Sequence, residues 1–122
     1  MVQILVIEDD DDFRKMLKVM LRQAGYEVFE ASNGKEGMIV YDSQEIDLVI
    51  TDIFMPEKEG VQTVMELRDK NPAVKIIAIS GGGSRDKLEY LESVKDIGVQ
   101  KTFTKPFVSR DFLAGIRDLL ES

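Results

Sequence analysis

Polar residues capable of phosphate or metal chemistry stand at the ends of four apolar runs in this chain. They are Glu8 and Asp9 after residues 3–7, Asp52 after residues 48–51, Ser80 after residues 75–79, and Lys105 after residues 101–104. In an open parallel α/β sheet, ligands bind outside the carboxyl ends of the strands. If these runs are neighbouring parallel strands, carboxylates, a hydroxyl and an ammonium meet at one edge, and the sequence predicts a site there.

The carboxylates of this predicted site indicate a cation. Two unit charges about 4 Å apart repel by roughly 4 kcal/mol at an effective dielectric of about 20. Glu8, Asp9 and Asp52 therefore cannot all stay ionised in one crevice without a positive ion. Oxygen-only ligands favour a hard ion, and Mg²⁺ typically takes one or two carboxylates, waters and a phosphate oxygen. With Ser80 and Lys105 beside it, such a site has the groups that phosphoryl transfer requires.

Each of these side chains also has a purely structural interpretation. Asp10, Asp11 and Asp12 extend the acidic run, and acids at a helix start complement the helix dipole. Lys105, taken alone, is a surface lysine before a turn proline, and Ser80 could simply cap a turn. The functional interpretation therefore depends on the combination of groups rather than on any one of them.

Strand and helix patterns alternate five times, and these elements must position the groups. A second strand pattern covers residues 26–31, and the near-continuous apolar run 48–50 is typical of a strand buried on both faces. Asn33 with Glu36 three residues later predicts a capped helix start. We expect a further helix to begin at Ser84, after the glycines 81–83, and Ser109 to cap the last helix.

Repeated β-α alternation implies a parallel sheet with helices on both faces and right-handed crossovers. We therefore expect an α/β fold with a doubly wound five-stranded parallel sheet of order 2-1-3-4-5, the flavodoxin-like (βα)5 arrangement. In this order the first and third strands flank the topological switch point. Because no linker interrupts the pattern, residues 1–122 are expected to form one domain.

The composition excludes several kinds of chemistry. The net charge of −7 opposes direct binding of nucleic acid or an anionic membrane by this domain. The chain has neither cysteine nor histidine, so thiol chemistry, imidazole bases and phosphohistidine on this chain are excluded. No apolar run approaches the length of about 18 residues that suggests a membrane span, and no signal peptide is seen, so a cytoplasmic protein is expected.

Taken in order, these landmarks resemble the receiver domain of two-component response regulators, including the chemotaxis regulators, over essentially the whole chain. The resemblance rests on the motifs ILVIEDD at 4–10, DIFMP at 52–56 with Gly60, Ser80, and KPF at 105–107. Four landmarks in this order and spacing are far more specific than any one of them.

The resemblance implies a phosphorylation-dependent signalling switch. Asp52 would be the phosphoacceptor, a nucleophilic carboxylate that forms an acyl phosphate. Lys105 would pair with the incoming phosphoryl group, and Ser80 would hydrogen-bond to that group once it is attached. The peptide bond between Lys105 and Pro106 is expected to be cis, as is typical in this family.

The resemblance also implies Mg²⁺ as the cofactor. Asp9 would be a direct ligand and Glu8 a ligand through water. Asp52 and the backbone carbonyl of Phe54 would complete the ligands from the protein.

The implied partners are proteins of a signalling pathway. The phosphoryl donor would be a phosphohistidine on a sensor histidine kinase or phosphotransfer protein. The face made by the fourth helix, fifth strand and fifth helix would signal to an output domain or downstream protein, or pair in a homodimer on phosphorylation. Such a domain is not a turnover enzyme; it catalyses its own phosphoryl transfer and its own slow dephosphorylation.

Three positions depart from the family pattern. Thr102 stands where a switching aromatic is usual, and strand alternation points the neighbouring Phe103 to the opposite face. Phe54 and Gly82, two positions past Asp52 and Ser80, have no side chain that can orient a hydrolytic water. We therefore expect slow autodephosphorylation and an altered coupling to the output face.

Three alternatives stay open. The spacing of Asp9 and Asp11 partly fits a phosphatase of the haloacid-dehalogenase type, although the expected glycine, threonine and cap insertion are missing. A flavodoxin-like cofactor module would need a loop rich in serine, threonine and glycine after the first strand, where this chain has aspartates. A pseudo-receiver would be an unphosphorylated binding module, although all five polar residues of the motif are present.

Overall fold

The computed structural model describes residues 1–53, 60–81 and 94–122. Five strands form one parallel sheet: β1 (Gln3–Ile7), β2 (Glu27–Ala31), β3 (Leu48–Asp52), β4 (Ile76–Gly81) and β5 (Lys101–Lys105). The helices described are α1 (Asp11–Gln23), α2 (Gly34–Ser43), α3 (Gly60–Lys70) and α5 (Ser109–Glu121), with a 3₁₀ turn, η1 (Val94–Ile97), before β5.

The strand order is β2-β1-β3-β4-β5, so the doubly wound order expected from the sequence is confirmed. β1 lies between β2 and β3, and the chain therefore winds outward from β1 in both directions. The direction of winding changes between β1 and β3, which makes the carboxyl ends of these two strands the switch point.

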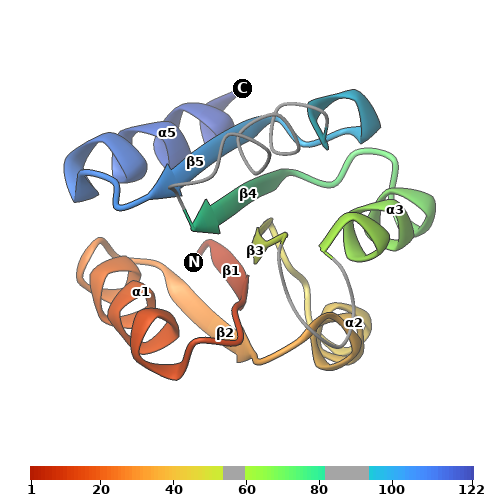
Figure 1. Ribbon diagram of the computed structural model, residues 1–122, viewed down its shortest axis with the longest axis horizontal. Coiled ribbons are helices and arrows are strands. Elements are labelled where there is room, and N and C mark those ends of the chain that lie inside the picture. Colours follow the sequence, from red (N-terminus) through yellow and green to blue (C-terminus); the bar gives the residue numbers. More distant parts are fainter. Residues whose placement is uncertain (54–59, 82–93) are drawn as a thin grey trace.

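The sheet lies between two layers of helices, with α1 and α5 on one face and α2 and α3 on the other (Figure 1). Alternation along each strand sorts the side chains between these layers. Ile4 and Val6 pack with Leu17 and Phe112 beneath α1 and α5. Their neighbours in β1 pack on the opposite face. Because both faces are covered, the inner strands are apolar along nearly their whole length.

Helix starts follow the capping prediction in one place and not in another. The Asn33 side chain accepts a hydrogen bond from the Glu36 amide at 2.8 Å, as predicted for α2. The Glu36 carboxylate instead accepts the amide and hydroxyl of Ser32, and these bonds lower the pKa of Glu36. The prediction that Ser109 caps the last helix is wrong. Val108 occupies the capping position of α5 without a side-chain bond, and Ser109 is already helical.

Alternation in β5 also agrees with the sequence. Phe103 lies on the face covered by α5, with its ring centroid 4.9 Å from that of Phe112. Thr102 pairs with Ala78, which faces the other layer. Three sequence expectations, the helix begun by Ser84 and the roles of Phe54 and Gly82, lie outside the described residues.

Candidate functional site

The carboxyl ends of β1 and β3 bring three carboxylates together, as the sequence predicted. One oxygen from each of Glu8, Asp9 and Asp52 lies within 4.8 Å of the other two. Glu8 is completely buried, Asp52 is 5% exposed, and Asp9 faces solvent. The cluster therefore has a buried floor and one side open to solvent.

Strand register explains why these side chains converge. Ile7 pairs with Thr51, so Glu8 and Asp52 are the next residues along two neighbouring parallel strands. Residues at equivalent positions of a parallel pair point to the same face of the sheet. That face is the one covered by α1 and α5.

Lys105, at the end of β5, reaches across this edge. Its Nζ lies 2.5 Å from Glu8 Oε1 and 3.1 Å from Asp52 Oδ2. The same ammonium lies 4.1 Å from the ring centroid of Phe13, close enough for a cation–π interaction. The lysine is therefore held in the site by two carboxylates and one aromatic ring.

Burial and charge set the protonation of the cluster. Burial raises the pKa of Glu8 to about 7; the Asp52 charge adds to the rise, and the hydrogen bond from Lys105 opposes it. Burial alone would lower the pKa of Lys105, but its contacts with Glu8 and Asp52 outweigh that effect and raise it. The cluster thus contains three acidic groups and one ammonium, and an additional cation would balance the charge when all three acids are ionised.

The donor atoms fit a hard divalent ion. The three carboxylates offer only oxygen, which suits Mg²⁺ better than a soft or nitrogen-seeking metal. Asp9 is exposed, so at least one of the three carboxylates can be reached from solvent. The predicted fourth ligand, the carbonyl of Phe54, lies outside the described residues.

Ser80 lies at the same edge, at the end of β4. It follows Ile79, which pairs with Asp52 on the neighbouring strand. The side chain is buried, and its hydroxyl donates to the Gly81 carbonyl at 3.2 Å.

The peptide bond between Lys105 and Pro106 is cis, as expected.

Gly60 lets α3 begin directly against the strand that carries the site. A Cβ at this position would collide with backbone atoms of Ile53 and Asp52. The Gly60 amide also donates to the Ile53 carbonyl at 3.2 Å. The first turn of α3 is therefore packed against the backbone of the Asp52 strand end.

The structural interpretation holds for the next acids of the run. Asp10 is the N-cap of α1 and accepts the Phe13 amide at 3.1 Å. Asp11 forms an ion pair with Arg14 at 2.7 Å, and Asp12 lies exposed in the first turn.

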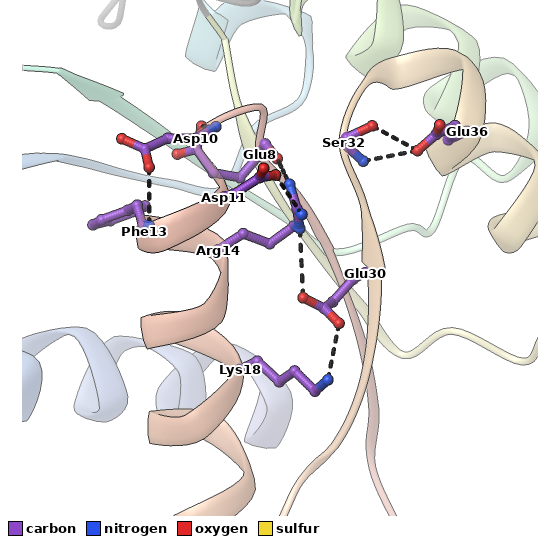
Figure 2. A network of polar contacts seen from close by, with 9 residues as sticks. All are labelled: Glu8, Asp10, Asp11, Phe13, Arg14, Lys18, Glu30, Ser32 and Glu36. Carbon is purple, nitrogen blue, oxygen red and sulfur yellow. Dashed lines mark hydrogen bonds and ion pairs between the residues drawn. The ribbon is translucent and has the colours of Figure 1, made fainter.

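Two residues that contact the site were not predicted from the sequence. The ring of Phe13 packs against the Lys105 ammonium. Arg14 Nη1 donates to the Glu8 carbonyl at 2.7 Å (Figure 2). Phe13 also packs against the core beneath α1, as many apolar helix residues do, and nothing in the sequence indicates its contact with Lys105. The spacing of three residues between Asp11 and Arg14 was the available signal for an ion pair, but not for the bond to Glu8.

The family model of the response regulator receiver domain matches residues 4–117. The chain belongs to this family. It is the receiver domain of a two-component response regulator, a class of domain that serves phosphorylation-dependent signalling. The resemblance inferred from the sequence is thereby confirmed.

Curated relatives agree with this assignment. The chain is 34% identical over 118 residues to a probable transcriptional regulator of Porphyra purpurea, covering 97% of this chain and 47% of that protein. It is 32% identical over 120 residues to the transcriptional regulatory protein CpxR of Klebsiella pneumoniae, covering 98% and 50%. The chain thus spans about half the length of these relatives.

Solved structures match over the whole fold. A response regulator receiver domain protein of Clostridium thermocellum superposes with a TM-score of 0.91 at 28% identity, covering 99% of this chain and 95% of that one. The response regulator TrrA of Thermotoga maritima, solved in complex with Mg²⁺ and BeF, superposes with a TM-score of 0.86 at 31% identity, covering 98% of this chain and 99% of that one.

None of the helices in the described part of the chain combines the length and apolar character that crossing a membrane requires.

Proposed function

We propose that Asp52 reversibly accepts a phosphoryl group from a phosphohistidine, with Mg²⁺ held by Glu8, Asp9 and Asp52. The observation that carries this proposal is the convergence of three carboxylates within 4.8 Å, with Lys105 bonded to two of them. Burying Glu8 and Asp52 so close together is costly unless positive charge compensates them, and a bound cation would supply that charge.

The transfer is an in-line substitution at phosphorus. An oxygen of Asp52 attacks and forms the new P–O bond, while the P–N bond to the donor imidazole breaks and its electron pair leaves with the nitrogen. Mg²⁺, when bound, supplies positive charge to the phosphoryl oxygens. The aspartyl phosphate then persists until water attacks it.

Lys105 and Ser80 supply hydrogen bonds to the added group. In the unphosphorylated protein the Lys105 ammonium is shared between Glu8 and Asp52, and it turns to a phosphoryl oxygen as charge develops there. The Ser80 hydroxyl, which donates to the Gly81 carbonyl, rotates to donate to another of these oxygens. In both cases a hydrogen bond made within the protein is replaced by a hydrogen bond to the doubly charged phosphoryl group.

The partners follow from this chemistry. The donor is a sensor histidine kinase or a phosphotransfer protein, since this chain has no histidine of its own. The receiver signals to an output domain or a downstream protein, with pairing of two receivers as a further consequence of phosphorylation. Relatives of about twice this length carry the name of transcriptional regulators, and we propose transcription as the process controlled.

The test is covalent labelling at Asp52. Purified protein is mixed with Mg²⁺ and a small phosphoramidate donor, and the mass of the protein and the position of the label are measured. We expect one phosphoryl group per chain, lost in Asp52→Asn and retained in the exposed control Asp118→Asn. Labelling that survives in Asp52→Asn would contradict the proposal. Failure to bind beryllofluoride with Mg²⁺ would favour a pseudo-receiver instead.

A further inference from the structure

We infer that Arg14 is a positioning residue for the metal site, acting through its hydrogen bond to the Glu8 main-chain carbonyl. The inference rests on the proposed function, because it concerns the same Mg²⁺ site. Arg14 lies in the first turns of α1 and points back toward the end of β1 (Figure 2).

The bond is formed where β1 leaves the sheet. The Glu8 amide donates to the Ala31 carbonyl at 3.0 Å, and the pairing of β1 with β2 and β3 ends at Ile7. Arg14 Nη1 then donates to the Glu8 carbonyl at 2.7 Å. That carbonyl belongs to the planar peptide unit joining Glu8 to Asp9, so holding it positions the nitrogen and Cα of Asp9, from which the Asp9 side chain departs.

The guanidinium is itself held on two further sides. Nη2 lies 2.7 Å from Asp11 Oδ1, and Nε lies 3.4 Å from Glu30 Oε1. Lys18 binds the other oxygen of Glu30 at 3.0 Å. The side chain of Arg14 is only 14% exposed. A planar fork with several fixed donors can make these contacts together, which a lysine ammonium cannot do at the same positions.

Because Arg14 is positively charged, the direction in which its removal changes the affinity for Mg²⁺ tests the inference. A cation near a Mg²⁺ site repels the ion, so removing Arg14 would strengthen Mg²⁺ binding if electrostatics were its only effect. A positioning role predicts the opposite result, because the Glu8–Asp9 turn loses its restraint. Removal of groups that orient metal ligands commonly costs about 10-fold or more in affinity.

The experiment is a titration of the unphosphorylated protein with Mg²⁺, in which the chemical shifts of the backbone amides report binding. We expect the dissociation constant for Mg²⁺ to rise about 10-fold in Arg14→Gln. Lys18→Gln is the matched control, since it removes one cation from the same network and leaves the bond to Glu8. Its dissociation constant should stay at or slightly below that of the wild type.

A second readout separates positioning from loss of folded protein. In Arg14→Gln the Mg²⁺ concentration for half-maximal labelling should rise, while the rate at saturating Mg²⁺ is retained; partial unfolding would lower that saturating rate instead. If Arg14→Gln does not fold, Arg14→Lys keeps the charge and the stem but loses the fork, and the same rise is expected.

Two outcomes are separable. A folded Arg14→Gln or Arg14→Lys that binds Mg²⁺ as tightly as the wild type overturns this inference and leaves the proposed function standing. A wild-type protein that binds no Mg²⁺ overturns the proposed function, and the role of Arg14 with it.

Discussion

Lys105 Nζ and Glu8 Oε1 lie 2.5 Å apart although the two residues are 97 positions apart in the chain. Their contact joins the first and last strands of the chain across the carboxyl edge of the sheet. Because Glu8 is completely buried, its carboxylate depends on this ammonium, or on a bound cation, for compensation. Affinity for Mg²⁺, stability and phosphoryl uptake are therefore coupled in one cluster.

Lys105→Met should affect Mg²⁺ binding and phosphoryl uptake in opposite directions. Removing the ammonium makes the net charge of the site more negative, so Mg²⁺ should bind more tightly and its dissociation constant should fall. The rate of labelling at saturating Mg²⁺ should fall by about 100-fold, because a charge that stabilises the transferring group is missing. Both are measured on one preparation, with Lys101→Met at the other end of β5 as the control. Weaker Mg²⁺ binding in Lys105→Met would refute the coupling.

The stability of the metal-free protein should fall as the pH rises from about 4.5 to about 7. The pKa of Glu8 is raised from 4.5 to about 7 in the folded state, so across this window the folded protein retains a proton that the unfolded chain has lost. Proton loss therefore favours unfolding until the pH exceeds the folded pKa. No histidine titrates in this range, which keeps the measurement clean.

Urea denaturation at pH 5.5 and pH 8 in a chelator tests this pH dependence. The wild type should be less stable at pH 8, while Glu8→Gln should show nearly equal stability at both values. A pH dependence that persists undiminished in Glu8→Gln would assign the effect to another group.

Gly60→Ala should weaken both the fold and the site. The added methyl collides with the backbone of Ile53 and Asp52, which cannot rotate away as a side chain can. We expect a loss of about 1–3 kcal/mol in the free energy of unfolding, together with slower labelling of Asp52. Gly81→Ala is the control for stability, because a Cβ there meets no atom within 4 Å. Equal stability of the two variants would mean that α3 shifts freely on the sheet.

The aspartyl phosphate of the isolated domain should decay slowly. Phe54 and Gly82 offer no polar side chain to orient a water toward phosphorus. After removal of the donor, the fraction of labelled protein should decline over hours, and Phe54→Asn, which adds an amide, should shorten that time. Decay within seconds in the wild type would show that another group positions the water.

The alternating strand and helix patterns of the sequence predicted most of the fold. The polar residues that follow the strands predicted most of the candidate site. Runs in which apolar residues alternate with polar ones, or follow one another without interruption, indicate buried strands. The carboxyl ends of parallel strands all lie at one edge of the sheet. The sequence therefore predicts that Glu8, Asp9 and Asp52 lie close together. The cap at Asn33 was predictable for the same reason, since it depends on residues three apart.

Other features were decided only by the tertiary structure. Ser109 has the right type for a cap, yet Val108, with an extended backbone, occupies the capping position, and Ser109 is already the first residue of α5. Arg14 and Phe13 resembled ordinary helix residues, and their contacts with Glu8 and Lys105 depend on how closely α1 packs over the edge of the sheet. Sequence patterns report local periodicity, whereas the partner of a long side chain depends on distances between elements remote in the chain.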